Sequence, residues 1–195
     1  AISTTSSAIT INPAPLNLSI SKTYDAATDF TRSDSYTISG TLYSTDTNPT
    51  IASGSANTSS ANANTYNSFS TNTLVLSNTN YAISGTIAAT IAKANLVLSG
   101  SRAYDTTTTI AGSILTATGV NGESFAVSGS ATSAISSANA RITPYGLSTV
   151  SGLSLGTASG GALVGNYNPI STTSSAITID KANAYVMIGT GQSST

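Results

Sequence analysis

The chain has 195 residues, of which 39% are hydrophobic, and its mean hydropathy of +0.12 allows packed cores and argues against disorder by composition. Six Lys and Arg residues and seven Asp and Glu residues make only 7% of the chain charged, so no cationic patch for nucleic acid or an anionic membrane is expected. The absence of histidine and cysteine removes disulfides and the usual ligands of zinc and redox metals, and we expect no cofactor.

The N-terminal residues contain a duplicated decapeptide. Residues 2–11 read ISTTSSAITI, and the same ten letters recur at residues 170–179. A Ser/Thr-rich composition does not produce ten identical letters by chance, so the identity indicates duplicated modules. We therefore expect residues 1–12 to be the last strand of a preceding repeat. No apolar run is long enough for a membrane helix, so no membrane insertion is expected, and we expect any export signal to lie outside this sequence.

The next residues begin the first of two predicted repeats. Residues 13–25 align without a gap on residues 93–105, and a third start appears at Lys181. This spacing predicts one repeat over residues 13–92 and a second over 93–180, with residues 181–195 as the first strand of a following repeat.

Further landmarks inside the repeats align with gaps. They are residues 34–40 on 123–129, Leu74 and Leu76 on Leu153 and Leu155, and Asn80-Tyr81 on Asn166-Tyr167. Each repeat then ends in an alternating apolar segment, at residues 83–91 or 170–179.

Strands are predicted throughout the two repeats. Leu16, Leu18 and Ile20 alternate with polar residues, which is the period of a sheet with one buried face, and no segment has a helical apolar stripe. Asn121-Gly122 and Ser128-Gly129 are predicted as turns. We expect an all-β fold with one small, immunoglobulin-like β-sandwich per repeat. A β-solenoid is the alternative, although its coil period of about 20–30 residues is much shorter than the 80 to 88 residues between repeats.

The repeated residues carry a family resemblance over nearly the whole chain. The landmarks are Lys93-Ala94, Leu96, Leu98-Ser99-Gly100, Tyr104-Asp105-Thr106-Thr107-Thr108, Val120-Asn121-Gly122-Glu123, Gly152-Leu153-Ser154-Leu155, Asn166-Tyr167, Ala176-Ile177-Thr178-Ile179 and, in the third start, Gly191-Gln192-Ser193-Ser194. They resemble the YDG-type, MBG-related tandem repeats of secreted bacterial adhesins of the filamentous-haemagglutinin type. The resemblance implies an extracellular or cell-surface, β-rich stalk without catalytic residues. The family usually has Gly after Tyr-Asp, whereas this chain has Ala26 and Thr106.

Two short motifs match catalytic patterns but lack their partners. Residues 152–156, GLSLG, match the pattern of a nucleophile elbow, yet the chain has no histidine to act as the base. Ser19 and Lys22 fit Ser-x-x-Lys, but the serine falls in a predicted strand and the accompanying motifs are missing. Neither Asp25 with Asp29 nor Asp46 with Asn48 has the spacing of a calcium loop. We predict no catalytic, cofactor-binding or metal-binding residues, and no enzyme.

Two functions remain open from the sequence. The first is a stalk, spacer or fibre segment of a bacterial extracellular adhesin, whose partners are neighbouring repeats of the same chain and which self-associates by strand addition between units. The alternative is a module that binds a carbohydrate or a host protein through the recurring tyrosines, Tyr24, Tyr104, Tyr81 and Tyr167. The other interpretation is a purely structural one, in which those tyrosines pack at a sandwich edge and the adjacent Asp or Asn shapes the turn.

Overall fold

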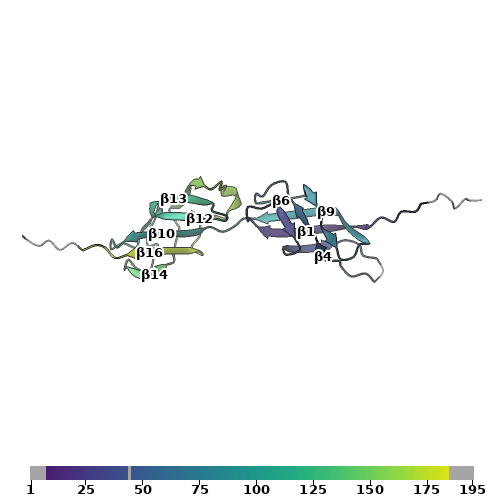
Figure 1. Cartoon of the computed structure of the whole chain (residues 1–195). Helices are drawn as coiled ribbons and strands as arrows, with labels where there is room; N and C mark the ends of the chain where they lie inside the picture. Colours follow the sequence, from purple (N-terminus) through teal and green to yellow (C-terminus); the bar gives the residue numbers. More distant parts are fainter. Residues whose placement is uncertain (1–7, 44, 185–195) are drawn as a thin grey trace, which may run out of the picture. The chain divides into compact units, whose positions relative to one another are not determined.

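The computed structural model describes residues 8–43 and 45–184 (Figure 1). It is nearly all-β, with 48% of residues in strands and 3% in helix, and it contains several sheets, none of them closed. The helical residues of the described part form two short 3-10 turns, η1 (Gly112–Ile114) and η2 (Val164–Asn166). The predicted all-β class and the scarcity of helix are thus confirmed. Within the described ranges, no helix has the length and apolar character needed to span a membrane.

The chain divides into two compact units. Unit 1 comprises Ala1–Ala94 and Leu163–Asn168, and unit 2 comprises Asn95–Ala162 and Pro169–Thr195. The strands of unit 1 are β1 (Ala14–Thr23), β2 (Asp29–Thr31), β3 (Ser35–Ser39), β4 (Ile51–Ser53), β5 (Ser55–Asn57), β6 (Asn64–Tyr66), β7 (Thr71–Asn72), β8 (Val75–Leu76) and β9 (Tyr81–Ala92). The strands of unit 2 are β10 (Val97–Ala103), β11 (Ile110–Ala111), β12 (Leu115–Thr118), β13 (Ser124–Ala131), β14 (Arg141–Tyr145), β15 (Leu153–Ser159) and β16 (Ser175–Asp180).

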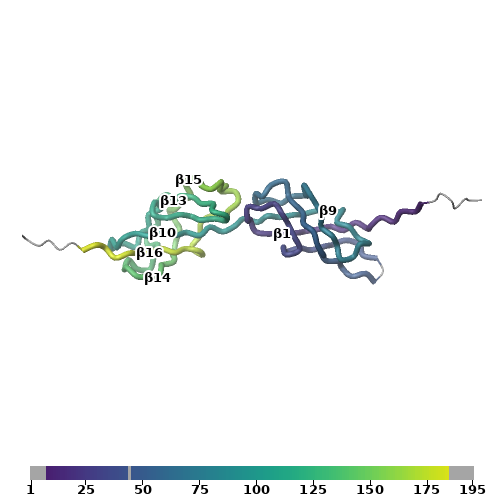
Figure 2. Tube along the Cα trace, viewed as in Figure 1, coloured from purple at the N-terminus to yellow at the C-terminus, as the bar shows by residue number. Residues whose placement is uncertain are grey.

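A parallel pair of strands forms the centre of unit 1. β1 and β9 lie side by side (Figure 2), and Leu18 pairs with Ile87 and Thr23 with Ala92. Leu16, Leu18 and Ile20 all point to the buried face, as the alternation predicts. A shift of one residue would turn this apolar set toward solvent, so burial fixes the register of the pair.

Unit 2 has the same parallel pair in the same register. β10 pairs with β16, with Leu98 opposite Ser175 and Ala103 opposite Asp180 (Figure 2). The residues of β10 stand 80 positions after their counterparts in β1, and those of β16 stand 88 positions after their counterparts in β9. The two gaps match the spacing of the repeat starts in the sequence. Leu98, Ile177 and Ile179 form the buried face here.

Strand pairing corrects one of the predicted alignments. β3 pairs with β1 through Ile20 and Tyr36, and β12 pairs with β10 through Gly100 and Leu115. β3 therefore corresponds to β12, and the alignment of residues 34–40 on 123–129 is wrong. Both segments share a Ser-aromatic pattern because each is an alternating strand that buries one face.

The true counterpart of Ser128-Gly129 is Ser53-Gly54, at the junction of β4 and β5. Residues 53–56 and 128–131 both read SGSA, and Phe30 pairs with Ala56 as Ile110 pairs with Ala131. Gly129 has a φ of 82° inside β13 and is not in a turn, so that predicted turn is also wrong. Its counterpart Gly54 has a φ of 85°. An added Cβ atom would overlap the backbone carbonyl of Thr73 at Gly54 and that of Gly152 at Gly129, which explains glycine at this position.

The predicted turn at Asn121-Gly122 is confirmed and determines how far the sheet of unit 2 extends. Both residues have positive φ, 51° and 80°, and the amide of Glu123 donates to the carbonyl of Val120 at 2.9 Å across them, closing the turn between β12 and β13. The seven-stranded sheet of unit 2 has the order β11-β13-β12-β10-β16-β14, with β15 added on β13. In unit 1, residues 40–50 separate β3 from β4, and the strands form sheets of four (β3-β1-β9-β6), three (β2-β5-β7) and two (β4-β8).

The predicted flanking strands are only partly within the described residues. Residues 1–7 and 185–195, including Gly191-Gln192-Ser193-Ser194, lie outside them, while residues 8–13 and 181–184 are described and are not in strands. The second copy of the decapeptide, by contrast, runs into β16.

Candidate functional site

The serines of the two catalytic patterns are engaged in strands. Ser154 lies in β15, where its hydroxyl is 2.9 Å from the hydroxyl of Ser128 on β13. Ser19 lies in β1, and the ammonium of Lys22 is 2.9 Å from a carboxylate oxygen of Asp25. The described part of the structure therefore brings neither serine together with a base.

The acidic residues considered for calcium are dispersed. Asp46 accepts a hydrogen bond of 2.8 Å from the Tyr81 hydroxyl, and Asp25 belongs to the turn described next. Among residues 8–43 and 45–184, no group of three or more His, Cys, Asp or Glu side chains gathers.

The two Tyr-Asp motifs form the same turn, one in each unit. Tyr24 donates its amide to the carbonyl of Ala92, and Tyr104 donates its amide to the carbonyl of Asp180, both at 2.8 Å. Each motif thus begins at the point where the parallel pairing of the first and last strands of its unit ends.

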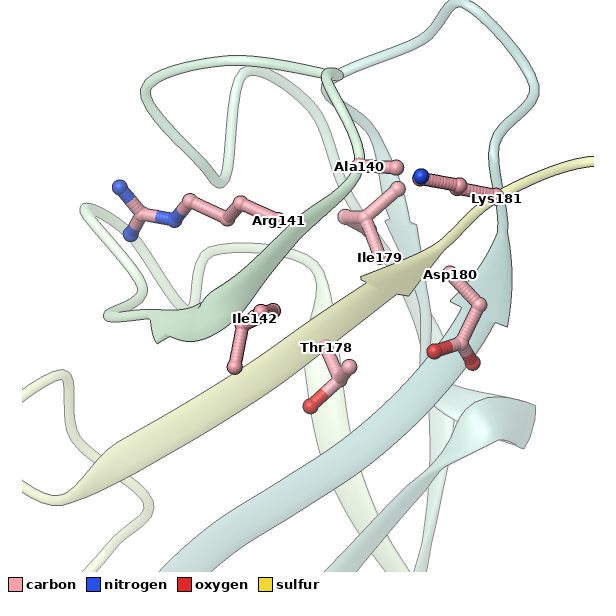
Figure 3. Close-up of a pocket in the computed structure, with 7 residues that line it drawn as sticks. All are labelled: Ala140, Arg141, Ile142, Thr178, Ile179, Asp180 and Lys181. Carbon is pink, nitrogen blue, oxygen red and sulfur yellow. The ribbon is translucent and has the colours of Figure 1, made fainter.

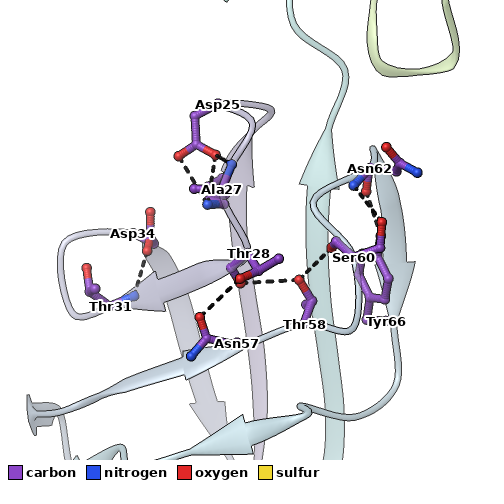
Figure 4. A network of polar contacts seen from close by, with 11 residues as sticks. Asp25, Ala27, Thr28, Thr31, Asp34, Asn57, Thr58, Ser60, Asn62 and Tyr66 are labelled. Atoms are coloured by element: carbon purple, nitrogen blue, oxygen red, sulfur yellow. Dashed lines mark hydrogen bonds and ion pairs between the residues drawn. The ribbon is translucent and has the colours of Figure 1, made fainter. Parts of the chain in front are cut away.

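The aspartate closes each turn through its side chain. Asp25 Oδ1 accepts the amide of Ala27 at 3.0 Å, and Asp105 Oδ1 accepts the amide of Thr107 at 2.9 Å (Figure 4 shows the turn of unit 1). A cation three residues before each aspartate forms an ion pair with it, Lys22 in unit 1 and Arg102 in unit 2.

The residue after each aspartate has a left-handed backbone. Ala26 has a φ of 65° and Thr106 a φ of 69°, the region that glycine adopts without steric cost. These are the positions where the resembled family has Gly. The turn therefore keeps the geometry that glycine favours although neither residue is glycine.

The pKa of the Asp105 carboxyl lies below its ordinary value. The chief cause is the hydrogen bond from the Thr107 amide, which favours the ionised form, and the Thr107 hydroxyl and the Arg102 guanidinium act in the same direction against partial desolvation. The turn of unit 2 is thus built around a charged aspartate.

The Asn-Tyr motifs pair with the start of a first strand. The Asn80 carbonyl accepts the amide of Ala14 at 2.8 Å, and the Asn166 carbonyl accepts the amide of Ala94 at 3.0 Å. Tyr81 lies opposite Ala14 and Tyr167 opposite Ala94, in both cases in parallel pairing. The predicted alignment of the two motifs is therefore confirmed in their strand pairing.

The side chains of the two Asn-Tyr motifs differ in their surroundings. The Tyr81 hydroxyl accepts the Tyr43 amide at 2.9 Å and donates to Asp46. The bond from the Tyr43 amide, the largest influence, lowers the pKa of Tyr81, but desolvation and the bond to Asp46 outweigh it and the pKa is raised. Asn80 is exposed, whereas Asn166 is only 2% exposed.

The side chain of Asn166 is hydrogen-bonded within unit 1 through both its oxygen and its nitrogen. Its Oδ1 accepts the amide of Ala63 at 2.9 Å, and its Nδ2 donates to Asn62 Oδ1 at 3.1 Å. Its backbone amide donates to the carbonyl of Leu163 at 3.0 Å, which closes turn η2. A buried carboxamide with donor and acceptor both satisfied fixes the position of the segment that carries it.

Tyr167 packs against the Tyr-Asp turn of unit 1. Its ring lies 5.5 Å from the Tyr24 ring at an interplanar angle of 81°, an edge-to-face contact. Asn168 then donates its amide to the carbonyl of Ala94 at 2.8 Å. Leu163–Asn168, which the repeat prediction places among residues 93–180, thus completes unit 1.

The loop that binds Asn166 was missed by the sequence analysis. Residues 59–63 read SSANA, and residues 136–140 read SSANA as well; we name them the SSANA loops of unit 1 and unit 2. In unit 1 the Tyr66 hydroxyl donates to the carbonyl of Asn62 at 2.7 Å (Figure 4), and in unit 2 the Tyr145 hydroxyl donates to the carbonyl of Asn139 at 2.8 Å. The identity of five letters was a usable signal, although its offset of 77 differs from that of the repeat starts.

A groove lies beside each SSANA loop. In unit 1 it is lined by residues 63–65 and 90–93, with a volume of about 290 Å³. In unit 2 it is lined by Ala140, Arg141, Ile142, Thr178, Ile179, Asp180 and Lys181, with a volume of about 360 Å³ (Figure 3). The two linings correspond position by position along the last strand and the SSANA side.

Comparisons with family models, curated proteins and solved structures found no match for this chain. The resemblance to YDG-type repeats therefore remains a prediction.

Proposed function

We propose that the chain is a structural repeat segment, a stalk, spacer or fibre element, of a bacterial extracellular adhesin. The single observation on which the proposal rests is the shared register of the two parallel strand pairs, β1 with β9 and β10 with β16. Repetition of one module along a chain is the mark of repeat proteins that act through length and nearest-neighbour contacts. The extracellular location and the adhesin family come from the sequence resemblance.

Within this proposal each repeat is a small β-sandwich. The buried apolar residues of unit 1 come from separate sheets, Ile20 from the four-stranded sheet, Phe30 from the three-stranded sheet and Ile51 from the two-stranded sheet. Packing between sheets of this kind fits a sandwich better than a coil of stacked turns.

The connection between the repeats is short. β9 ends at Ala92 and β10 begins at Val97, and within those few residues Ala94 is paired in the bridge to Tyr167. A segment this short and this bonded differs from the long Gly/Ser-rich or Pro-rich sequences that act as tethers. A stiff connection is what a stalk needs to convert copy number into length.

The test is small-angle scattering on chains of increasing copy number. Chains with two, three and four repeats are compared, the added copies being residues 93–180. The proposal expects the maximum dimension to increase by a constant increment per copy. Scattering from freely jointed units, whose dimensions increase with roughly the square root of copy number, would overturn the stalk function.

The alternative function, binding of a carbohydrate or host protein, is favoured by one observation. Tyr104 is 39% exposed and Tyr43 is 62% exposed, and exposed tyrosine rings suit sugar stacking. Tyr167, by contrast, is buried and offers no face to a ligand. Saturable binding to a glycan array that is lost in Tyr104→Ala and kept in Tyr66→Phe supports this alternative; unchanged binding, or none, removes it.

Self-association by strand addition is the third element of the proposal. β3 and β6 form the edges of the four-stranded sheet of unit 1, and β14 forms an edge in unit 2 with Ile142 almost fully exposed. β3 and β6 carry no charged side chain, so these edges have little protection against pairing with another chain. Sedimentation at rising concentration tests this element, and a chain that stays monomeric contradicts it.

A further inference from the structure

The end of unit 2 that carries Tyr104 corresponds to the end of unit 1 that holds Leu163–Asn168. Tyr104 corresponds to Tyr24, because each donates its amide to the last residue of the parallel partner strand. The SSANA loops correspond through the tyrosine hydroxyls bonded to Asn62 and Asn139. Ala182 follows the end of β16 at the same distance as Ala94 follows the end of β9.

The two ends differ in what covers them. Tyr24 is 5% exposed beneath the Tyr167 ring, whereas Tyr104 is 39% exposed. Ala94 is buried in its bridge to Tyr167, whereas Ala182 is exposed. The tyrosine ring and the alanine at this end are therefore covered by the Leu163–Asn168 segment in unit 1 and exposed in unit 2.

We propose that this end of unit 2 is a docking surface for the Asn-Tyr segment of a following repeat, a peptide of the sequence Leu-Val-Gly-Asn-Tyr-Asn. The inference rests on the proposed function as a repeat array and specifies how one repeat binds the next. The docked asparagine accepts the amide of Ala140 and donates to Asn139 Oδ1, as Asn166 does with Ala63 and Asn62. The docked tyrosine covers the Tyr104 ring.

The chemistry of the surface selects this occupant. An amide N–H and an amide oxygen on one loop match a carboxamide, which has one acceptor and one donor group. The tyrosine ring beside them accepts the edge of a second aromatic ring. The exposed backbone at Ala182 provides the N–H and C=O groups that pair with a short parallel segment, as Ala94 pairs with Tyr167.

The groove beside the docking surface distinguishes unit 2 from unit 1. Arg141 and Ile142 stand where unit 1 has Asn64 and Thr65, and the Arg141 guanidinium lies 3.5 Å from the centre of the Tyr145 ring (Figure 3 shows Arg141 and Ile142 on β14). These side chains line the groove beside the docking surface. The groups that contact the docked segment are the amide of Ala140, the side chain of Asn139 and the ring of Tyr104.

The experiment lengthens the full chain by one repeat. A second copy of residues 93–180 is inserted between Asp180 and Lys181, so that Lys93-Ala94 of the insert takes the place of Lys181-Ala182 without a seam. The inserted copy carries Tyr104→Phe, because its own Tyr104 would lie at the new open end in an otherwise identical peptide. Site-resolved tyrosine nitration then reports on Tyr104 of the original repeat, and amide exchange with segmental isotope labelling reports on its Ala140. Nitration of Tyr104 is expected to fall to the level of Tyr24, which is 5% exposed against 39% for Tyr104, and the Ala140 amide is expected to become protected.

Two variants make the result specific. Asn166→Ala in the inserted copy is expected to restore both signals, whereas Asn80→Ala in the first repeat, an exposed counterpart, leaves them unchanged. Protected amides in the β10–β16 pair of the insert show that it is folded. A folded insert with Tyr104 as reactive as in the 195-residue chain overturns the docking proposal.

A second arm does not depend on a folded insert. The 195-residue chain is extended by a Gly/Ser linker and residues 163–168 alone, with and without Asn166→Ala in the extension. Protection of Tyr104 that requires the asparagine supports the docking surface, and equal reactivity in both chains counts against it. Scattering separates the two proposals: linear growth with Tyr104 unprotected removes only the docking surface, and Tyr104 protection with freely jointed units removes only the stalk.

Discussion

The two units share their centre and differ at their periphery. Both have the parallel strand pair, the Tyr-Asp turn and the SSANA loop, but the hairpin at Asn121-Gly122 joins β12 to β13 in unit 2, while residues 40–50 interrupt the corresponding connection in unit 1. One sheet of seven strands and three smaller sheets thus surround the same pair. The comparison indicates that the strand pair and its turn define the module and that the connecting loops are free to vary.

The largest expected effect comes from substitutions that disrupt the core of one unit at a time. Phe30 and Ile110 occupy equivalent, fully buried positions on β2 and β11. We expect Phe30→Ala to cost about 3–5 kcal/mol and Ile110→Ala about 2–5 kcal/mol of the free energy of unfolding, through lost burial and a cavity. Amide exchange is expected to rise in β9 for the first variant and in β16 for the second.

The control for the core variants is Val75→Ala, an exposed position on β8, which is expected to change exchange little. Loss of protection in β9 and β16 together, from either core variant, contradicts the description of two separate cores. Protection lost only in the mutated unit supports it, with Leu163–Asn168 following unit 1.

The next effect concerns the segment that completes unit 1. Asn166→Ala removes two side-chain bonds and leaves the half-buried amide of Ala63 without its acceptor, which costs about 1–3 kcal/mol. Asn80→Ala alters an exposed side chain at the equivalent position and is expected to stay within about 0.5 kcal/mol. Urea midpoints of unit 1 measure both. Equal shifts in the two variants would show that the buried carboxamide contributes nothing of its own.

The parts of the fold predicted from sequence are those set by local pattern. The alternation of Leu16, Leu18 and Ile20 predicts the buried face of β1, and Asn121-Gly122 predicts its hairpin, because burial and positive φ act within a few residues. The match of residues 34–40 to 123–129 failed because alternating strands resemble one another, and only pairing partners distinguish β12 from β13.

The candidate site was predicted only in part, for a different reason. The recurrence of Tyr24-Asp25 and Asn166-Tyr167 identified the residues, but their meeting depends on long-range contacts between Tyr24 and Tyr167 and between Asn62 and Asn166. Sequence patterns carry no information on which distant segments meet unless covariation is available. The SSANA loops were overlooked because their offset of 77 departs from the repeat spacing.

A smaller effect sharpens the comparison of the two Tyr-Asp turns. A left-handed backbone conformation costs a residue with a Cβ atom about 1–2 kcal/mol. Replacement by glycine removes this cost, but the greater conformational freedom of glycine in the unfolded chain offsets part of the stabilisation. We therefore expect Thr106→Gly to stabilise unit 2 by about 1 kcal/mol and Ala26→Gly to stabilise unit 1 by somewhat less, since threonine is β-branched. Thermal midpoints of each unit, followed by exchange, measure the gain. Ala27→Gly is the control and is expected to destabilise, and a loss of stability in Thr106→Gly would contradict the assigned turn.

The smallest effect is a dependence on acid of the turn of unit 2. The pKa of Asp105 is lowered in the folded state, so the unfolded chain binds a proton at higher pH than the folded chain does. The resulting stability is present above the ordinary carboxyl pKa of about 4 and is lost as the pH falls through the lower, folded value.

Asp105→Asn is expected to make the thermal midpoint of unit 2 less dependent on pH below about 4, because the amide oxygen remains an acceptor for Thr107 and does not titrate. Thr107→Val removes only the hydroxyl donor and is expected to shift the loss to higher pH, between the wild-type and Asp105→Asn curves. A wild-type midpoint that stays constant from neutral pH to pH 2, or one that falls identically in Asp105→Asn, would mean that the charged aspartate does not hold this turn.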